Sequence, residues 1–287
     1  MSDNRPRQAV ASTTDERPRP PRRPWRPAVS VVAFVLAAAL AWVGHIGNSF
    51  ALVVALLVPM AMLALGWVPL LRLPSPRGTT AVQFIAVGIL LVPAVVRPWQ
   101  TLEWLPGAVA VAMIASFIHQ LVRRDARPRL VESVSASAAG VALLSSAVCM
   151  VPLAAGSLGR DAMAAVMAAT AAATLADIGL GRVPRGVIAA SCAAASLVLG
   201  ALAAVGIHAL LGSTPISTPL VALAGASAGV ASYAVRQIQS VLPSLWGRRA
   251  QVASAAGSVL CTGAVAYGLA WIAAGGFAHL TVSAAAL

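Results

Sequence analysis

The chain has 287 residues, of which 59% are apolar and 10% are charged, and its formal net charge is +12. A water-soluble fold of this composition would lack the polar residues to cover its surface, so the composition excludes a soluble globular protein and predicts a membrane protein. In a soluble domain the basic excess would indicate nucleic-acid binding. Arginines that flank apolar segments face anionic lipids instead, so we expect no nucleic-acid partner.

The first 27 residues are rich in arginine and proline and have no apolar periodicity. We therefore expect a disordered cytoplasmic tail over residues 1–27 and a transmembrane helical domain over residues 28–287. Nine apolar runs follow the tail, each long enough to cross a hydrocarbon core of roughly 30 Å. These predicted spans are 28–44, 49–71, 79–96, 105–122, 133–155, 161–179, 186–210, 217–235 and 251–275. The predicted fold class is an all-α, polytopic membrane bundle. Its alanine-rich sixth span inserts weakly, so neighbouring helices should shelter it from lipid.

The arginines predict how this bundle is oriented. All twenty basic residues are arginine, and eighteen lie in the tail or in every second connection, with only Arg97 and Arg160 in the other set. Arg236 is counted among the eighteen because the eighth predicted span ends before it. Arginine in short loops stays in the cytoplasm during insertion, so we expect the N-terminus inside and the C-terminus outside. The arginine-only basic set and abundant alanine are typical of a GC-rich actinobacterium, and we expect a bacterial plasma membrane.

Asp177, near the inner end of the sixth span, is the strongest candidate for a functional residue. An ionisable side chain at membrane depth is costly and marks either a functional site or a paired charge. With Arg182 and Arg185 of the following loop, its carboxylate would suit a cation or a phosphate-bearing substrate. Paired with one of those arginines at the interface, it would only anchor the helix, which is the more usual role of such a pair.

A second concentration of charge follows the fourth span, where Arg123, Arg124, Arg127 and Arg129 surround Asp125. This pattern suits an anionic lipid headgroup or a phosphate, and equally suits plain topological anchoring. We favour anchoring, accompanied by contact with anionic lipids at the cytoplasmic face. Membrane lipids are thus the expected partners, and the sequence indicates no particular protein partner. The candidate functional cluster comprises Asp177, Arg182, Arg185, Arg123, Arg124 and Arg248.

Other residue patterns concern packing and the classes of activity that the chain lacks. Gly225 and Gly229 have the spacing that lets two membrane helices approach closely. Cys149, Cys192 and Cys261 lie inside apolar runs without paired spacing or nearby histidines, so we expect small packing residues and neither a zinc site nor a disulfide. No phosphate-cradling glycine-rich loop with a lysine occurs, which excludes an ATP-driven pump within this chain.

Three short segments carry a likeness to a known family. They are residues 176–179 (Ala-Asp-Ile-Gly) with Gly181-Arg182, residues 240–243 (Ser-Val-Leu-Pro) and residues 264–267 (Ala-Val-Ala-Tyr). Their layout resembles that of bacterial phosphatidate cytidylyltransferases, polytopic enzymes that make CDP-diacylglycerol. The resemblance implies that Asp177, Arg182 and Arg248 converge at the inner face.

The same comparison separates the chain from those enzymes. Residues 244–251 (Ser-Leu-Trp-Gly-Arg-Arg-Ala-Gln) stand where the family has His-Gly-Gly and Asp-Arg, and no acidic residue follows Asp177. One carboxylate cannot hold the two divalent cations that such a reaction needs. We therefore expect no catalytic residue, no metal and no cofactor. The sequence favours a non-catalytic role, either a permease-like carrier of a small or lipidic anion or a scaffold for envelope assembly, with a divergent CDP-diacylglycerol synthase or pseudoenzyme as the alternative.

Overall fold

The structure is a computed structural model that describes residues 27–96, 101–123, 129–180, 185–212 and 214–276. Residues 1–26 of the expected tail lie outside them. The described chain forms α-helices and two short 3-10 helices: α1 (Pro27–Ile46), α2 (Ser49–Leu71), α3 (Pro76–Val96), α4 (Thr101–Val122), α5 (Leu130–Val148), η2 (Val151–Ala155), α6 (Ser157–Leu180), α7 (Arg185–Leu211), α8 (Thr218–Ser240), η3 (Pro243–Trp246), α9 (Arg248–Leu260) and α10 (Gly263–Ala273). No strand occurs in this part of the chain, which confirms the all-α fold class.

Nine segments of the described chain are long and apolar enough to cross a membrane, which agrees with the nine predicted spans. Most span ends differ from the prediction by a few residues, and the fifth predicted span ends as an α-helix at Val148 and continues as η2. Two differences involve arginines. α8 continues to Ser240 instead of ending at residue 235, and α9 begins at Arg248 instead of residue 251. The nine segments are compatible with a multi-pass membrane protein.

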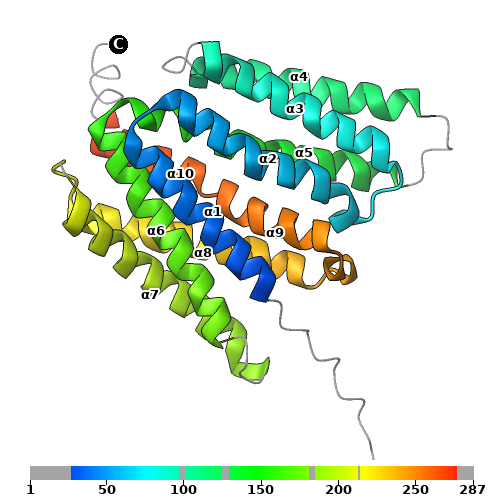
Figure 1. The fold of residues 1–287 in the computed structure, drawn as a ribbon. Coiled ribbons are helices and arrows are strands. Elements are labelled where there is room, and N and C mark those ends of the chain that lie inside the picture. The colour runs from blue at the N-terminus through cyan, green and yellow to red at the C-terminus, as the bar shows by residue number, and fades with distance from the viewer. Residues whose placement is uncertain (1–26, 97–100, 124–128, 181–184, 213, 277–287) are drawn as a thin grey trace, which may run out of the picture.

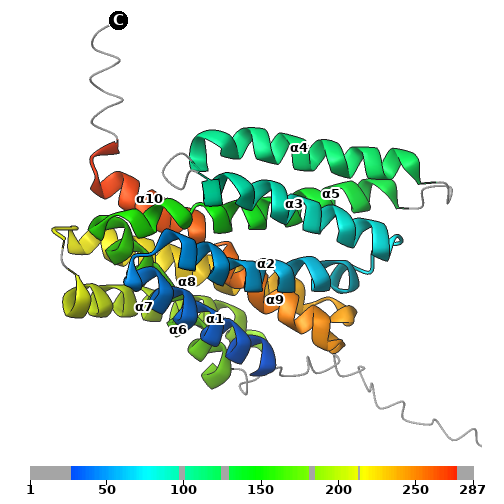
Figure 2. The ribbon, with the colours of Figure 1, turned by 45° about the horizontal axis from the view of Figure 1, so that its top comes forward.

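The helices form one elongated bundle with two sides (Figure 1 and Figure 2). On one side α3, α4 and α5 pack against each other, and on the other side α6, α7 and α8 do the same. Between them lie α1, α2 and α9, with α2 packed on α9 and α1 packed on both α6 and α9. The molecule therefore contains two three-helix units that are joined through a central layer.

The alanine-rich sixth span forms a complete helix, α6. Of its most apolar stretch 67% is buried, the largest share among the nine segments. It contacts α1, α7, α8 and α10. The small alanine side chains allow this close packing, so the expectation that neighbouring helices shelter the weak span is confirmed.

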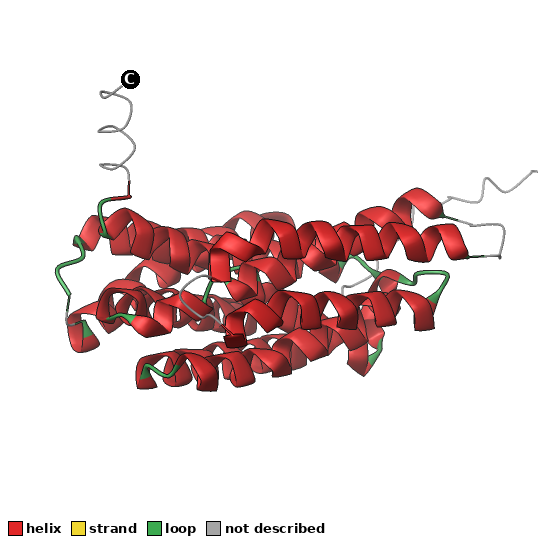
Figure 3. Cartoon of the chain, turned by 90° about the horizontal axis from the view of Figure 1, so that it is seen from above, coloured by secondary structure: helices red, strands yellow, loops and turns green. Residues whose placement is uncertain are grey.

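The helix ends gather at the two ends of the bundle, as the view in Figure 3 shows. At one end, Nη1 of Arg129 donates to the carbonyl oxygen of Arg72 over 2.9 Å, which joins the residue before α5 to the residue after α2. At the other end, the Arg160 side chain lies against Gly47, between α1 and α2. The connection after α2 and the connection before α5 therefore lie at one end of the bundle. Arg160, one of the two arginines that the sequence assigns to the other face, lies at the opposite end.

The ninth predicted span is interrupted rather than continuous. α9 ends at Leu260 and α10 begins at Gly263, whose Cβ, if it had one, would collide with the carbonyl oxygen of Ser146 on α5. The Ser146 hydroxyl donates to the carbonyl oxygen of Cys261 over 3.0 Å and accepts from the N–H of Ala264 at 3.0 Å. The side chain thus satisfies backbone groups at the interruption, which a lipid environment could not do.

The α7–α8 interface is built on the small residues that the sequence indicates. Gly225 and Gly229 of α8 lie against Gly200 and Ser196 of α7, and a Cβ on Gly225 would lie 2.5 Å from the carbonyl oxygen of Gly200. The backbones are therefore in direct contact, and the predicted close approach is confirmed.

Candidate functional site

Asp177 forms a buried ion pair with Arg236. Asp177 lies about one turn before the end of α6, and Arg236 lies about one turn before the end of α8. Nε of Arg236 donates to Oδ2 of Asp177 over 2.6 Å, and the two side chains are 5% and 15% exposed for Arg236 and Asp177, respectively. Both residues belong to segments that could cross a membrane. The pair therefore places two opposite charges inside the apolar part of the molecule.

The guanidinium of Arg236 joins three helices. Its Nη1 donates to Oγ of Ser232 on α8 at 2.5 Å and lies 3.4 Å from Oγ of Ser258 on α9. Its Nη2 donates to the carbonyl oxygen of Ala173 on α6 at 3.4 Å. Most of the N–H groups of this cation are thus engaged, as burial of a charged group requires.

The polar contacts continue from the ion pair toward the interruption between α9 and α10. Ser258 lies one turn before Thr262, the residue that precedes α10. Oγ1 of Thr262 lies 3.3 Å from Oγ1 of Thr170, which is buried on α6. A polar layer therefore runs between α6, α8 and the broken ninth span.

Only one of the two carboxylate oxygens of Asp177 accepts a hydrogen bond from the described residues. Its Oδ1 is buried and has no hydrogen-bond partner within the described residues, whereas Oδ2 accepts from Arg236. A carboxylate oxygen can accept a proton or a hydrogen bond from a donor. Arginine, in turn, matches carboxylates and oxoanions through its planar fork of N–H groups. The pair combines a place for a proton with a cation that can hold an anion.

The structure places the other candidate residues as follows. Arg248 is exposed at the start of α9, whereas Arg123 is 9% exposed and donates from Nη1 to Oε1 of Gln120 over 2.9 Å. Arg124 and Arg182 lie outside the described residues, and Arg185 begins α7 without a described side chain. The described contacts bring Asp177 to Arg236 and bring neither Arg123 nor Arg248 to this pair.

Arg236 is the residue of this site that the sequence reasoning did not single out. The sequence places it in a loop because the eighth predicted span ends at residue 235. A signal for its burial exists, because Gly225, Gly229, Ser232 and Arg236 recur at helical spacing and all lie on the buried face of α8. An arginine that continues a stripe of small residues faces the helix interface.

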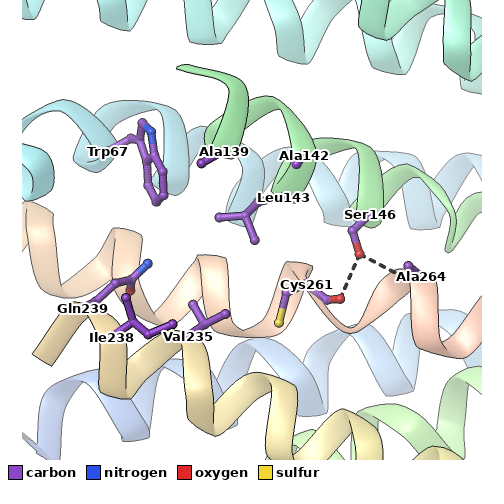
Figure 4. A pocket seen from close by; sticks show the side chains of 10 residues that line it. All are labelled: Trp67, Ala139, Ala142, Leu143, Ser146, Val235, Ile238, Gln239, Cys261 and Ala264. Carbon is purple, nitrogen blue, oxygen red and sulfur yellow. Dashed lines mark hydrogen bonds between the residues drawn. The ribbon is translucent and has the colours of Figure 1, made fainter. Parts of the chain in front are cut away.

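A pocket of about 410 Å³ lies beside the interruption, between α2, α5, α8 and the broken span (Figure 4). Its walls are mostly apolar, with Trp67 at one end and Leu143 of α5 facing Val235 of α8. Its polar groups include Ser146, which caps the interruption, and Gln239, whose Oε1 has no hydrogen-bond partner in the described chain. The pocket shares α8 with the ion pair.

Within the described residues, no group of three or more His, Cys, Asp and Glu side chains is placed to hold a metal ion. Comparisons of the chain with protein-family models, with curated proteins and with solved structures found no match.

Proposed function

We propose that this chain is a permease-like membrane protein that carries a small anion together with a proton, with Asp177 and Arg236 as its exchange centre. The observation that carries the proposal is the buried ion pair itself, because one oxygen of its carboxylate has no hydrogen-bond partner among the described residues. This role develops the permease-like function that the sequence favours.

The energetics support a functional role for the pair over a purely structural one. Transfer of two charges out of water costs several kcal/mol per ion, and well-packed apolar residues of similar volume often replace a buried pair without loss of stability. A scaffold could hold α6 and α8 together with small residues alone, as Gly225 and Gly229 hold α8 to α7. Ionisable residues inside membrane segments accordingly mark ion and substrate routes.

The proposed exchange is balanced in charge. When Oδ1 of Asp177 takes up a proton, the carboxylate becomes a neutral carboxylic acid and Arg236 loses its counterion. A small anion then takes the place of the carboxylate at the guanidinium, through the charge-assisted hydrogen bonds that arginine forms with oxoanions and carboxylates. The loaded site holds one proton and one monovalent negative charge, so its net charge equals that of the empty site.

The interruption between α9 and α10 supports movement at this place. Ser258 contacts the guanidinium one turn before the break, and the Ser146 side chain of α5 hydrogen-bonds to the backbone on both sides of the break. Discontinuous helices beside a charged site occur in many transporters, where they let one part of the bundle rock against another. We place the hinge of the proposed carrier at Cys261 and Thr262.

The proposed setting is a bacterial plasma membrane, with the N-terminus inside and the C-terminus outside. The 18 to 2 split of the arginines supports this orientation. In that orientation Asp177 and Arg236 lie in the inner half of the bilayer, and anionic lipids face the exposed arginines at the start of α9.

Proton entry into proteoliposomes tests the proposal. Purified protein is reconstituted with a pH-sensitive dye inside the vesicles, and inward gradients of a monovalent anion are applied: dihydrogen phosphate at mildly acidic pH, nitrate or gluconate. We expect at least one of these anions to drive proton entry in the wild type. Asp177→Asn should reduce that entry to the rate of protein-free vesicles, because the amide cannot take up the proton.

Asp161→Asn is the matched control. Asp161 is the other acidic residue of α6, it is also buried, and it accepts a hydrogen bond from Thr214 at 2.6 Å near the opposite end of the helix. This variant should retain anion-driven proton entry. Proton entry in Asp177→Asn that equals the wild-type rate, or the absence of a response to all three anions, would contradict the proposed function.

A further inference from the structure

A second buried polar region lies away from the ion pair, within the three-helix unit α3–α4–α5. The polar side chains on the inward faces of these helices are at most 2% exposed: Thr79 and Gln83 on α3, Ser116 and Gln120 on α4, and Ser133 and Ser137 on α5. Transmembrane helices normally bury apolar or small residues at such contacts. Six polar side chains in one unit therefore need an explanation.

These side chains lie at the same end of the unit. Thr79, Ser133 and Gln120 each fall within about 5 Å of a helix end, at a rise of about 1.5 Å per residue. Gln83 and Ser116 lie one turn deeper. Two contacts fix the levels of the helices: a Cβ on Gly78 of α3 would collide with His119 of α4, and one on Gly140 of α5 would collide with the Gln83 amide. All three helices contact one another, and the six polar side chains at this end of the unit are called the polar cluster below.

Most of the cluster is not hydrogen-bonded within the described chain. Both amide atoms of Gln83 lack a partner, as do Nε2 of Gln120 and the hydroxyl oxygens of Thr79, Ser116 and Ser133. Two members have local hydrogen bonds: Ser137 donates to the carbonyl oxygen of Ser133 at 2.9 Å, and Oε1 of Gln120 accepts from Arg123. Each buried polar group without a hydrogen-bond partner destabilises the fold. Repeated within one unit, this cost indicates a site that a hydrogen-bonding molecule enters.

The groups themselves indicate the chemistry of that molecule. Every unpartnered group is uncharged, and the set contains hydroxyls that both donate and accept, amide donors, and the Gln83 carbonyl as an acceptor. Of the titratable side chains at this end of α4, Arg123 already donates to Gln120 and the imidazole of His119 lies against Gly78 of α3. An anion would meet the Gln83 oxygen without compensating charge, whereas a neutral molecule that donates and accepts would satisfy the whole set.

We infer that α3, α4 and α5 enclose a binding site for small uncharged hydrogen-bonding solutes, of the size of water, urea or glycerol. The polar side chains lie nearest the end of the unit at which α3 and α5 begin and α4 ends. The atoms of the site are sealed from solvent in the present conformation, so entry requires the ends of these three helices to separate. The site is distinct from the Asp177–Arg236 pair, which lies between α6 and α8.

Thiol modification tests this inference. Ser116→Cys and Ser133→Cys each change one atom in the cluster and place a reporter inside it. Ala112→Cys, one turn deeper on α4, and Ala136→Cys, one turn along α5, are the matched controls at buried apolar positions. Membrane vesicles of both orientations are treated with uncharged methyl methanethiosulfonate or with its anionic sulfonatoethyl analogue. Mass spectrometry of peptides then separates each new cysteine from Cys149, Cys192 and Cys261.

We expect the uncharged reagent to modify both cluster cysteines about tenfold faster than their controls. This ratio corresponds to a difference of about 1.4 kcal/mol in the free energy of reaching the thiol. The faster reaction should occur from the membrane face that carries the α4–α5 connection, and the sulfonate should react more slowly. Equal rates at cluster and control cysteines would show a dry helix interface and overturn the inference. A sulfonate rate equal to or above that of the uncharged reagent would show an anion site and overturn it as well.

Discussion

At the scale of single residues, Asp177 and Arg236 stabilise each other across α6 and α8. Each charge is acceptable at this depth only because the other lies 2.6 Å away. Ser232, Ser258 and the Ala173 carbonyl complete the shell around the guanidinium. Removal of one partner leaves the other as an uncompensated buried charge, whereas removal of both leaves only neutral polar groups.

Arg236→Gln should therefore lower the free energy of unfolding by about 3–5 kcal/mol, the usual cost of breaking a buried pair. The double variant Asp177→Asn/Arg236→Gln should recover most of that loss. Thermal unfolding of the purified proteins in detergent measures both effects. A double variant that is as unstable as Arg236→Gln alone would show that the charges do not depend on each other.

The sequence could identify Asp177 but not its partner. Hydropathy and charge rules treat an arginine near a span end as a loop residue, so these rules place Arg236 in the cytoplasmic connection. α8 continues through it because a carboxylate 59 positions earlier in the chain neutralises it. Local sequence patterns carry no signal for an ion pair between residues so far apart in the chain. Trp67 illustrates the same limit: it lies near a span end, where indoles anchor to the interface, yet it is 5% exposed and donates to the Ala136 carbonyl oxygen.

At the scale of helices, the small residues of α7 and α8 determine how closely the two backbones approach. Gly229 lies against the Ser196 carbonyl oxygen, so the interface has no room for another carbon atom. Gly206 of α7 differs, because a Cβ there would have no neighbour within 4 Å. Both glycines lie inside helices, but Gly229 is tightly packed and Gly206 is not.

Gly229→Ala should consequently destabilise the protein by about 1–3 kcal/mol, the usual cost of overpacking. Gly206→Ala should be neutral or stabilising by up to about 1 kcal/mol, because alanine favours a helix over glycine. Unfolding of both variants under the same conditions checks the contrast. Equal stability of the two variants would mean that α7 and α8 can separate without cost.

The number of segments long and apolar enough to cross a membrane, and their approximate positions, could be predicted, since runs of apolar residues determine both. The interruption of the ninth span could not. No proline marks it, and it arises where Gly263 meets the Ser146 backbone and where the Ser146 hydroxyl replaces a helical hydrogen bond. The cause lies on α5, far from the interruption in sequence.

At the scale of the whole molecule, the arginine-rich connections and Arg160 lie at opposite ends of the bundle. The proposed orientation has a direct consequence for fusions. A reporter joined after Leu287 should behave as exported, and one joined after Arg129 should behave as cytoplasmic. Alkaline phosphatase and a fluorescent protein serve as the paired reporters. A cytoplasmic signal from the C-terminal fusion would contradict nine crossings.

The same distribution of charge predicts contact with anionic lipids. Arg248 and Arg249 are exposed at the start of α9, and each arginine near an anionic leaflet gains about 1 kcal/mol. Arg248→Gln/Arg249→Gln should therefore retain less phosphatidylglycerol or cardiolipin through purification than the wild type does. Native mass spectrometry measures this retention, and Arg160→Gln, at the opposite end, is the control. Equal retention by all three proteins would show that the arginines at the start of α9 do not bind anionic lipids.

The most direct test of the exchange centre is the protonation of Asp177 when an anion binds. Infrared difference spectra of the reconstituted protein, recorded with and without the anion that drives proton entry, should contain the carbonyl stretch of a protonated carboxylic acid. That band should be absent from Asp177→Asn and present in Asp161→Asn. A spectrum in which anion binding produces no such band, or one in which the band persists in Asp177→Asn, would contradict an exchange between the Asp177 carboxylate and an anion at Arg236.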